Sequence, residues 1–191
     1  VRLHLANGFL ERGYIVDLVV VNAVGEMRPQ VPEGANVVDL AARGALSSIS
    51  ALRSYFREYK PAAVLSAQTN HNIAAIWARR LSGITTRLVV GEHNNMREII
   101  KGATFRDRLR PLAARLIYPG ADAILAVSHG VADALSALTG IDRNSIQVIY
   151  NPVVSSKIEE LSQEDPLHPW LKQNDVPVII SIGSLSEQKD Y

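Results

Sequence analysis

Residues 62–90 read AAVLSAQTNHNIAAIWARRLSGITTRLVV, and this stretch decides the fold. It begins with an apolar run from Ala62 to Leu65 and ends with another from Leu88 to Val90, each of a length typical of one buried strand. Between these runs, large apolar residues recur at helical spacing, namely Ile73, Ile76, Trp77 and Leu81. A strand, a helix and a second strand in this order predict a right-handed crossover between parallel neighbours.

The same alternation continues on both sides of this stretch. Further strands are predicted at Ile15 to Val21, Ala123 to Val127, Ile146 to Ile149 and Val178 to Ile182, with a weaker one at Asn36 to Leu40. One-faced amphipathic helices are predicted around three sets of residues: Leu46, Ile49, Leu52, Phe56 and Tyr59; Phe105, Leu109, Leu112 and Leu116; and Val131, Leu135 and Leu138. We therefore expect an α/β fold with a doubly wound, Rossmann-like parallel sheet covered by helices on both faces.

The composition shifts after Asn151-Pro152, where a polar and charged stretch follows. We expect residues 1–152 to form an N-terminal Rossmann-like domain that is truncated at its start, and residues 153–175 to form a linker. Residues 176–191 would then begin a second Rossmann-like domain, also truncated. On this interpretation the chain is a fragment of a longer protein.

Composition limits the classes of function. The 191 residues are 47% hydrophobic, enough to bury a core, and 20 basic residues against 19 acidic ones leave a net charge of +1. That charge gives no field that would attract nucleic acid. The chain has no cysteine, which fits a reducing compartment, and no apolar run long enough to span a bilayer. We expect a cytoplasmic location.

Polar residues follow four of the predicted strands, where ligands bind in open parallel sheets. They include Asn70, His71, Glu92, His93, Asn94, Ser128 and Asn151. Hydroxyl, amide, imidazole and carboxylate groups at one rim predict a cleft that binds polyols. Ser128, Asn70 and His71 have an alternative role as helix caps, and Asn151 with Pro152 as a turn. His93, beside Gly91 and directly after a buried strand, favours a role in the site.

Other kinds of site lack their usual signals. The five histidines lie in separate local contexts, and no pair has the spacing of a zinc helix. No Gly-x-Ser-x-Gly, Walker or Gly-x-Gly-x-x-Gly motif is present, which removes the usual support for hydrolase, P-loop and dinucleotide-binding functions. We expect no metal and no cofactor.

One segment is locally basic. Residues 97–115 contain six basic and two acidic residues, a local net charge of +4: Arg97, Lys101, Arg106, Arg108, Arg110 and Arg115 against Glu98 and Asp107. A solvated helix face is one interpretation. The other is contact with an anionic acceptor or with the inner face of an anionic membrane.

Several stretches, in order, resemble the retaining glycosyltransferases of family 4, which have two Rossmann-like domains in a GT-B fold. They are Leu5-Ala6-Asn7-Gly8 through Val16-Asp17-Leu18, Gly91-Glu92-His93-Asn94, Ala126-Val127-Ser128, Val148-Ile149-Tyr150-Asn151-Pro152, His168-Pro169-Trp170-Leu171, and Val178 through Asp190. The resemblance covers nearly the whole chain. It implies a nucleotide-sugar donor, transfer with retention to a saccharide or lipid-linked acceptor, and no metal.

The resemblance also implies roles for individual residues. Lys189 would contact the donor diphosphate, Gly183 would allow backbone to approach it, and Ser184 stands where many members carry arginine. His93 would lie near the transferred sugar as the catalytic residue. The acceptor side would be bound by Asn70, His71, Glu92, Asn94, Ser128 and Asn151.

Function follows from the resemblance as an expectation. Cell-envelope or capsule polysaccharide synthesis is the expected context, and the 191 residues by themselves are expected to be inactive. Two alternatives remain open: a GT-B-like epimerase that acts on the nucleotide sugar, and a non-catalytic domain that binds a glycan.

Overall fold

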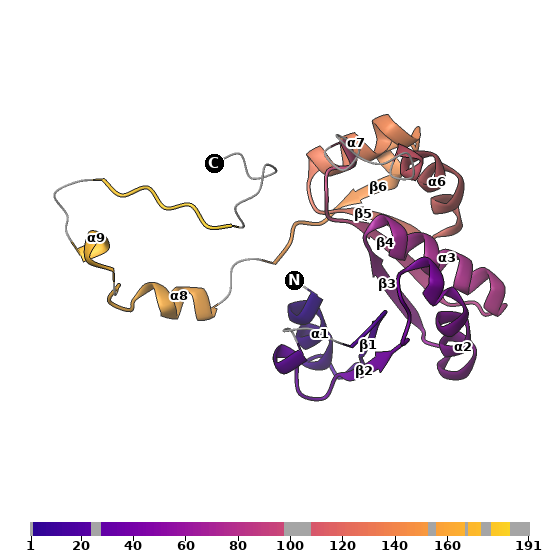
Figure 1. The fold of residues 1–191 in the computed structure, drawn as a ribbon, viewed down its shortest axis with the longest axis horizontal. Coiled ribbons are helices and arrows are strands. Elements are labelled where there is room, and N and C mark those ends of the chain that lie inside the picture. The colour runs from indigo at the N-terminus through magenta and orange to yellow at the C-terminus, as the bar shows by residue number, and fades with distance from the viewer. Residues whose placement is uncertain are drawn as a thin grey trace. The chain divides into compact units, whose positions relative to one another are not determined.

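A computed structural model describes residues 2–23, 28–97, 108–152, 156–166, 168–172 and 177–183. The chain divides into two compact units, Val1–Asn151 and Pro152–Tyr191 (Figure 1). Each unit is described by itself. The assignment of residues 1–152 to a truncated N-terminal domain, of 153–175 to a linker and of 176–191 to the start of a second domain stays a prediction.

The larger unit contains two parallel sheets with flanking helices. One sheet pairs β1 (Asp17–Val20) with β2 (Asn36–Asp39). The other has four strands in chain order, β3 (Ala63–Ala67), β4 (Arg87–Glu92), β5 (Ala123–Ala126) and β6 (Ile146–Val148). Every pairing is parallel, so each connection must cross over, and this confirms the predicted α/β, Rossmann-like class.

The crossovers of the larger unit are mostly helical (Figure 1). Among the described residues of this unit, the α-helices with defined bounds are α1 (Arg2–Leu10), α2 (Ile49–Tyr59), α3 (Thr69–Ser82), α6 (Arg110–Ile117) and α7 (His129–Thr139). Short 3₁₀ segments are η1 (Arg28–Gln30), η2 (Leu46–Ser48), η3 (Tyr118–Gly120) and η4 (Arg143–Ser145). Helices α3 and α7 end at Gly83 and Gly140, both with φ +73°, a left-handed conformation that glycine adopts without strain.

The core lies where the middle of the larger sheet meets α2, α3 and α6. Leu88 and Val90 of β4 are fully buried and join Phe56, Ile76 and Tyr118 in one apolar cluster. Burial of this apolar surface is the main force that holds the strand ends in fixed positions.

The buried helix faces agree with the prediction only in part. The core includes these members of the predicted faces: Leu52, Phe56, Ile73, Ile76, Val131 and Leu135. Trp77 and Leu81 were expected in the core but are exposed, whereas Ala74, Ala75 and Ala78 of the same helix are buried. Small side chains let α3 approach its neighbours closely, which leaves the bulky residues outside. Five residues of the other predicted faces are also exposed, namely Leu46, Tyr59, Leu109, Leu112 and Leu116.

The smaller unit contains α8 (Ser156–Ser162) and α9 (Pro169–Lys172). The strand predicted at Val178 to Ile182 is wrong for this structure, because residues 177–182 adopt no strand. Ile179 and Ile182 are 96% and 91% exposed. A strand needs a hydrogen-bonded neighbour, and none of the described strands pairs with this segment.

Candidate functional site

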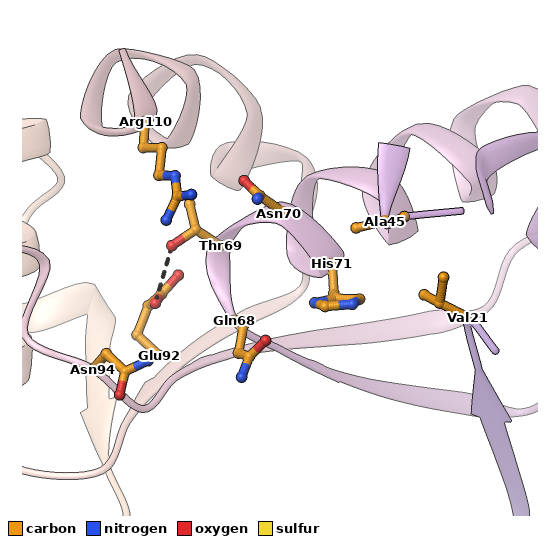
Figure 2. A pocket seen from close by; sticks show the side chains of 10 residues that line it. Val21, Ala45, Gln68, Thr69, Asn70, His71, Glu92, Asn94 and Arg110 are labelled. Carbon is orange, nitrogen blue, oxygen red and sulfur yellow. Dashed lines mark hydrogen bonds between the residues drawn. The ribbon is translucent and has the colours of Figure 1, made fainter. Parts of the chain in front are cut away.

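A pocket of about 390 Å³ lies at the carboxyl ends of β3 and β4. The strand ends, the start of α3, the start of α6 and the residues after β1 supply its walls. Figure 2 shows the lining residues, which are Val21, Gly44, Ala45, Gln68, Thr69, Asn70, His71, Glu92, Asn94 and Arg110. Most carry amide, hydroxyl, imidazole or charged groups, so the pocket presents hydrogen-bonding atoms rather than an apolar wall.

Glu92 lies in a buried network at the base of this pocket. It is the last residue of β4, is 2% exposed, and accepts hydrogen bonds from three side chains. The Tyr118 hydroxyl and the Asn72 amide (3.2 Å) donate to Oε1, and the Thr69 hydroxyl donates to Oε2 at 3.3 Å. Burial raises the pKa of Glu92, while these three donors and the charge of Arg110 act in the opposite direction.

Asn72 ties this network to the backbone. Its side chain is fully buried, and Nδ2 also donates to the Gly91 carbonyl at 2.9 Å and to the Tyr118 oxygen at 3.0 Å. Its Oδ1 atom has no partner among the described residues. Burial raises the pKa of Tyr118, as does the neighbouring Glu92 carboxylate. The network therefore holds the start of α3 and the start of η3, the 3₁₀ segment after α6, against the end of β4.

His71 brings an imidazole to the opposite side of the pocket. Figure 2 shows its ring between Gln68 and Val21. Burial lowers the pKa of His71, and the positive charge of Arg2 lowers it further. The ring is thus held neutral near pH 7 and can both donate and accept. Its Nδ1 atom is buried without a hydrogen-bond partner among the described residues.

Gln68 stands at the turn between β3 and α3 with a strained backbone. Its φ and ψ are +78° and +138°, in a region that non-glycine residues rarely occupy. Two backbone hydrogen bonds hold this conformation, from Gln68 N–H to the Gly91 carbonyl (3.1 Å) and from Asn72 N–H to the Gln68 carbonyl (2.9 Å). The turn points the Gln68 side chain to the pocket (Figure 2).

The structure brings together four of the residues singled out from the sequence. Asn70, His71, Glu92 and Asn94 all line the pocket. The capping role considered for Asn70 and His71 is wrong, because α3 begins at Thr69 and places both residues within its first turn. Their contribution to acceptor binding stays a prediction.

Three other predicted residues do not line this pocket. Ser128 caps α7, accepting a hydrogen bond from the Val131 N–H at 3.2 Å, so its capping role is confirmed. His93 is half-buried after β4, and burial together with Arg2 lowers its pKa. Asn151 is the last residue of the larger unit. The catalytic role of His93 and the acceptor-binding roles of Ser128 and Asn151 stay predictions.

The predicted donor contacts fall in the smaller unit. Gly183 is exposed, while Ser184 and Lys189 lie outside the described residues. Part of the basic segment, residues 98–107, also lies outside them. In the described ranges no group of three or more potential ligands could hold a metal ion, and no helix has the length and apolar character to cross a membrane.

Several pocket residues were missed from the sequence. Gln68 and Thr69 belong to the same polar stretch after β3 as Asn70, so the strand-end rule alone was a sufficient signal for them. Arg110 carried no strand-end signal, because it is 18 residues beyond Glu92 and starts a different helix; the sequence marked it only as part of the basic segment, for which contact with an anionic acceptor was one interpretation. Val21 directly follows β1, whereas Gly44 and Ala45 lie between β2 and η2, and all three supply little chemistry.

A parallel sheet with flanking helices and a polar pocket at the carboxyl edge of its strands defines the class of this protein as Rossmann-like α/β. Comparison with known proteins gives the family. Residues 1–152 match the model of the glycosyl transferase 4-like domain, and the chain belongs to that family.

A solved structure shares the fold. The apo form of a lipopolysaccharide outer core galactosyltransferase, WaaB, is 19% identical with a TM-score of 0.53. The match covers 72% of this chain but only 36% of that chain, so the chain corresponds to about a third of the length of this structural relative. No curated protein matches the chain significantly.

Proposed function

We propose that the protein is a retaining glycosyltransferase that moves a sugar from a nucleotide-sugar donor to a saccharide or lipid-linked acceptor. Cell-envelope or capsule polysaccharide synthesis is the proposed context. The observation that carries the proposal is the polar pocket at the ends of β3 and β4, inside a domain of the glycosyl transferase 4-like family. The structural similarity to the galactosyltransferase named above also supports the proposal.

The pocket has the chemistry required of an acceptor site. Asn70, Asn94 and Gln68 offer amides that donate and accept, and His71 offers a neutral imidazole ring. Its volume lies in the range of about 300–1,000 Å³ usual for small-molecule sites. A sugar ring, with hydroxyl groups on every side, matches such a wall of mixed donors and acceptors.

Glu92 has a different role in this proposal. Both of its oxygens already accept hydrogen bonds within the protein, and the side chain is almost fully buried. It therefore acts as a positioning residue that fixes Thr69 and Asn72 at the pocket. His93 is the proposed catalytic residue, and Gly183, Ser184 and Lys189 are the proposed donor contacts.

A membrane contact through α6 is part of the same proposal. Leu109, Leu112 and Leu116 lie three and four residues apart and are 44%, 54% and 69% exposed. Arg108 and Arg115 are exposed nearby, and residues 108–117 contain no acidic side chain. A basic helix with an outward apolar stripe fits an anionic bilayer surface, where each basic residue contributes about 1 kcal/mol.

The membrane contact is tested by flotation with liposomes. We expect binding to vesicles that contain anionic lipid, weaker binding to neutral vesicles, and loss of binding in Leu112→Ser/Leu116→Ser. Equal flotation with neutral and anionic vesicles, or no binding to either, would contradict this contact and leave the transferase proposal untouched.

The reaction is tested by sugar transfer with the intact protein. We expect an added saccharide acceptor to receive the sugar with retained anomeric configuration, which NMR of the product reports. His93→Ala should lower kcat/KM strongly, while the matched control His168→Ala, an exposed residue of the smaller unit, should not. Epimerised donor without transfer would favour an epimerase, and unchanged transfer by His93→Ala would contradict its catalytic role.

A further inference from the structure

Arg143 connects two side chains of α7 outside the pocket described above. Its Nε donates to Asp133 Oδ1 at 2.5 Å, and one terminal nitrogen donates to the Ile146 carbonyl at 3.2 Å. The other terminal nitrogen lies 3.0 Å from Nδ1 of His129, the first residue of α7. Since α7 contacts both β5 and β6, this arrangement fixes the His129 ring near the carboxyl end of β5 (Figure 1).

Stability gives a weak explanation for this arrangement. The Asp133 side chain is 65% exposed, and ion pairs with so much exposure contribute little to the free energy of unfolding. The contact between Arg143 and His129 adds no attraction between opposite charges. What the three contacts of Arg143 do provide is one defined orientation for an exposed imidazole.

The contact with Arg143 also fixes where the imidazole carries its proton. A guanidinium has donors only, so His129 Nδ1 must accept, and the proton of the ring lies on Nε2. Among the described residues, Nε2 has no hydrogen-bond partner, and the side chain is exposed. His129 thus presents one oriented N–H donor to solvent just after β5.

An exposed aromatic ring lies beside this donor. Tyr150, two residues after β6, is 65% exposed, and its ring centroid lies 6.3 Å from that of His129 with an angle of 69° between the planes. The Ile149 N–H donates to the Ala126 carbonyl at 3.0 Å, which keeps the residues after β6 next to the end of β5. The two rings therefore come together because their strands are neighbours.

A sugar ring matches this pair of groups. The face of an aromatic ring is electrically negative and attracts C–H groups, while an N–H donor binds a hydroxyl oxygen. A sugar ring carries C–H groups on a face and hydroxyls around its rim, so it can use both contacts at once. An anion would gain little from the tyrosine face, and a purely apolar ligand would leave the N–H unused.

The pair lies along the same sheet edge as the pocket. Glu92 of β4 pairs with Ala126 of β5, which pairs with Val148 of β6, so these strands end level with one another. Adjacent strands are about 5 Å apart, which puts the end of β6 about 10 Å from the end of β4. A substrate with more than one ring can therefore follow this edge.

We propose that Tyr150 and His129 form a second subsite for a sugar ring, in which the tyrosine stacks on the C–H face and His129 Nε2–H donates to a hydroxyl oxygen. Arg143 and Asp133 are positioning residues that hold the imidazole. This rests on the proposed function only in that both substrates contain sugar rings. The ring belongs either to an acceptor that extends beyond the pocket or to the nucleotide-sugar donor, and the tests below separate these sources.

NMR titration of the isotope-labelled 191-residue chain with the methyl glycosides of glucose, galactose, mannose and N-acetylglucosamine tests the subsite. We expect at least one of them to shift the amide signals of residues 127–130 and 149–151 in the millimolar range. Tyr150→Ala should weaken this binding about 10-fold, whereas Tyr150→Phe, which keeps the ring, should change it by less than about 2-fold. Tyr14→Ala is the matched control, because Tyr14 is 60% exposed and also has a ring neighbour, Phe9, but lies before β1.

A double-mutant cycle tests the positioning role of Arg143. His129→Ala should weaken binding of the same glycoside about 5-fold, as loss of one neutral hydrogen bond predicts. Arg143→Leu should also weaken it, but the double variant should bind no more weakly than His129→Ala alone. Losses that add in the double variant would contradict a role through His129, and thermal unfolding confirms that each variant is folded.

Kinetics of the intact protein identify the source of the ring. A higher KM for the acceptor in Tyr150→Ala, with the KM for the nucleotide sugar unchanged, assigns the subsite to the acceptor. The reverse pattern assigns it to the donor sugar. Either pattern supports the subsite, and unchanged KM values for both substrates would overturn it.

The outcomes separate this inference from the proposed function. The subsite is overturned if no glycoside shifts these signals, if binding is unchanged in Tyr150→Ala, or if Tyr14→Ala weakens binding equally. Efficient transfer by the intact protein would then still support the transferase. Conversely, glycoside binding that depends on Tyr150, without any transfer by the intact protein, would support the subsite and contradict the reaction.

Discussion

Replacing Gln68 with glycine should stabilise the protein and weaken its pocket at the same time. Gln68 has φ +78° and ψ +138°, a conformation that costs a non-glycine residue about 1–3 kcal/mol. Glycine adopts this region freely and keeps both backbone hydrogen bonds, to Gly91 and from Asn72. The Gln68 side chain is exposed, so its removal sacrifices little packing.

The effect on stability is best measured as the difference in the free energy of unfolding between Gln68→Gly and Gln68→Ala, because both variants lack the amide. Two opposing contributions, backbone strain and the entropy of the unfolded chain, determine this difference. Glycine relieves strain of about 2 kcal/mol, and its greater freedom in the unfolded chain costs about 0.4–1 kcal/mol. The glycine variant should therefore be more stable than the alanine variant by about 1.3 kcal/mol. For a unit of this length that corresponds to a rise in Tm of about 3–5 °C.

Chemical denaturation gives the free energy of unfolding, and transfer kinetics of the intact protein report the pocket. Both Gln68 variants should raise the KM for acceptor, because both lose the same amide. Lys60→Gly is the control: Lys60 has φ +44° at the exposed end of α2, away from the pocket, so this change should affect stability alone. A Gln68→Gly variant less stable than Gln68→Ala would refute the strain argument. Unchanged KM in both would refute a role in the site.

Three further substitutions test the packing and charges that hold the site. In Glu92→Gln, the free energy of unfolding should rise relative to that of the parent protein as pH increases above about 4.3. The pKa of Glu92 is raised in the folded state, so above this pH the folded parent binds more protons than its unfolded chain and becomes less stable as pH rises. Denaturation of both proteins across a pH series measures the difference. Gly120→Ala should lose about 1–3 kcal/mol, because the added Cβ would lie 2.9 Å from Cγ2 of the buried Ile76; an unchanged Tm would contradict this. Asp122→Asn should destabilise the protein more at pH 7 than at acidic pH, since the Leu88 N–H foremost lowers the pKa of Asp122 and the stabilising effect of the carboxylate is lost as pH falls through that pKa. A stability difference independent of pH would contradict that account.

The fold was largely predictable from the sequence because strand length and position depend on local hydrophobicity. The five strands predicted from Ile15 to Ile149, together with the weak one at Asn36, are all present within a few residues of their expected bounds. The strand expected at Val178 is different in kind. Its apolar run has strand character, but a strand forms only when a neighbour supplies the other half of each hydrogen bond, and the local pattern carries no information about that neighbour.

The predicted helix faces were only partly right, for a related reason: Ile73, Ile76 and Leu135 are buried, but other members of these faces are exposed. Large apolar residues at helical spacing mark a face that is apolar, but burial is decided by which face a neighbour covers. In α3 that neighbour approaches so closely that alanines fill the contact, and Trp77 remains outside. In α6, Pro111 and Ala114 are buried while Leu112 and Leu116 face outward. An apolar stripe left outside in this way is what suggests an external surface such as a membrane.

The candidate site was likewise predictable where it depends on strand ends, and not where it depends on contacts from distant parts of the chain. Asn70, His71, Glu92 and Asn94 follow strands that pair in parallel, and parallel pairing alone places their ends at one edge. Whether each side chain then faces ligand or protein depends on contacts from elsewhere in the chain. Tyr118, 26 residues beyond Glu92, donates to its carboxylate and helps turn an apparent ligand-binding acid into an internal support. Arg110, from the same helical region, lines the pocket and places a positive charge there. The segment from α6 to η3 thus supplies contacts to Glu92 and to the pocket that the strand-end pattern could not predict.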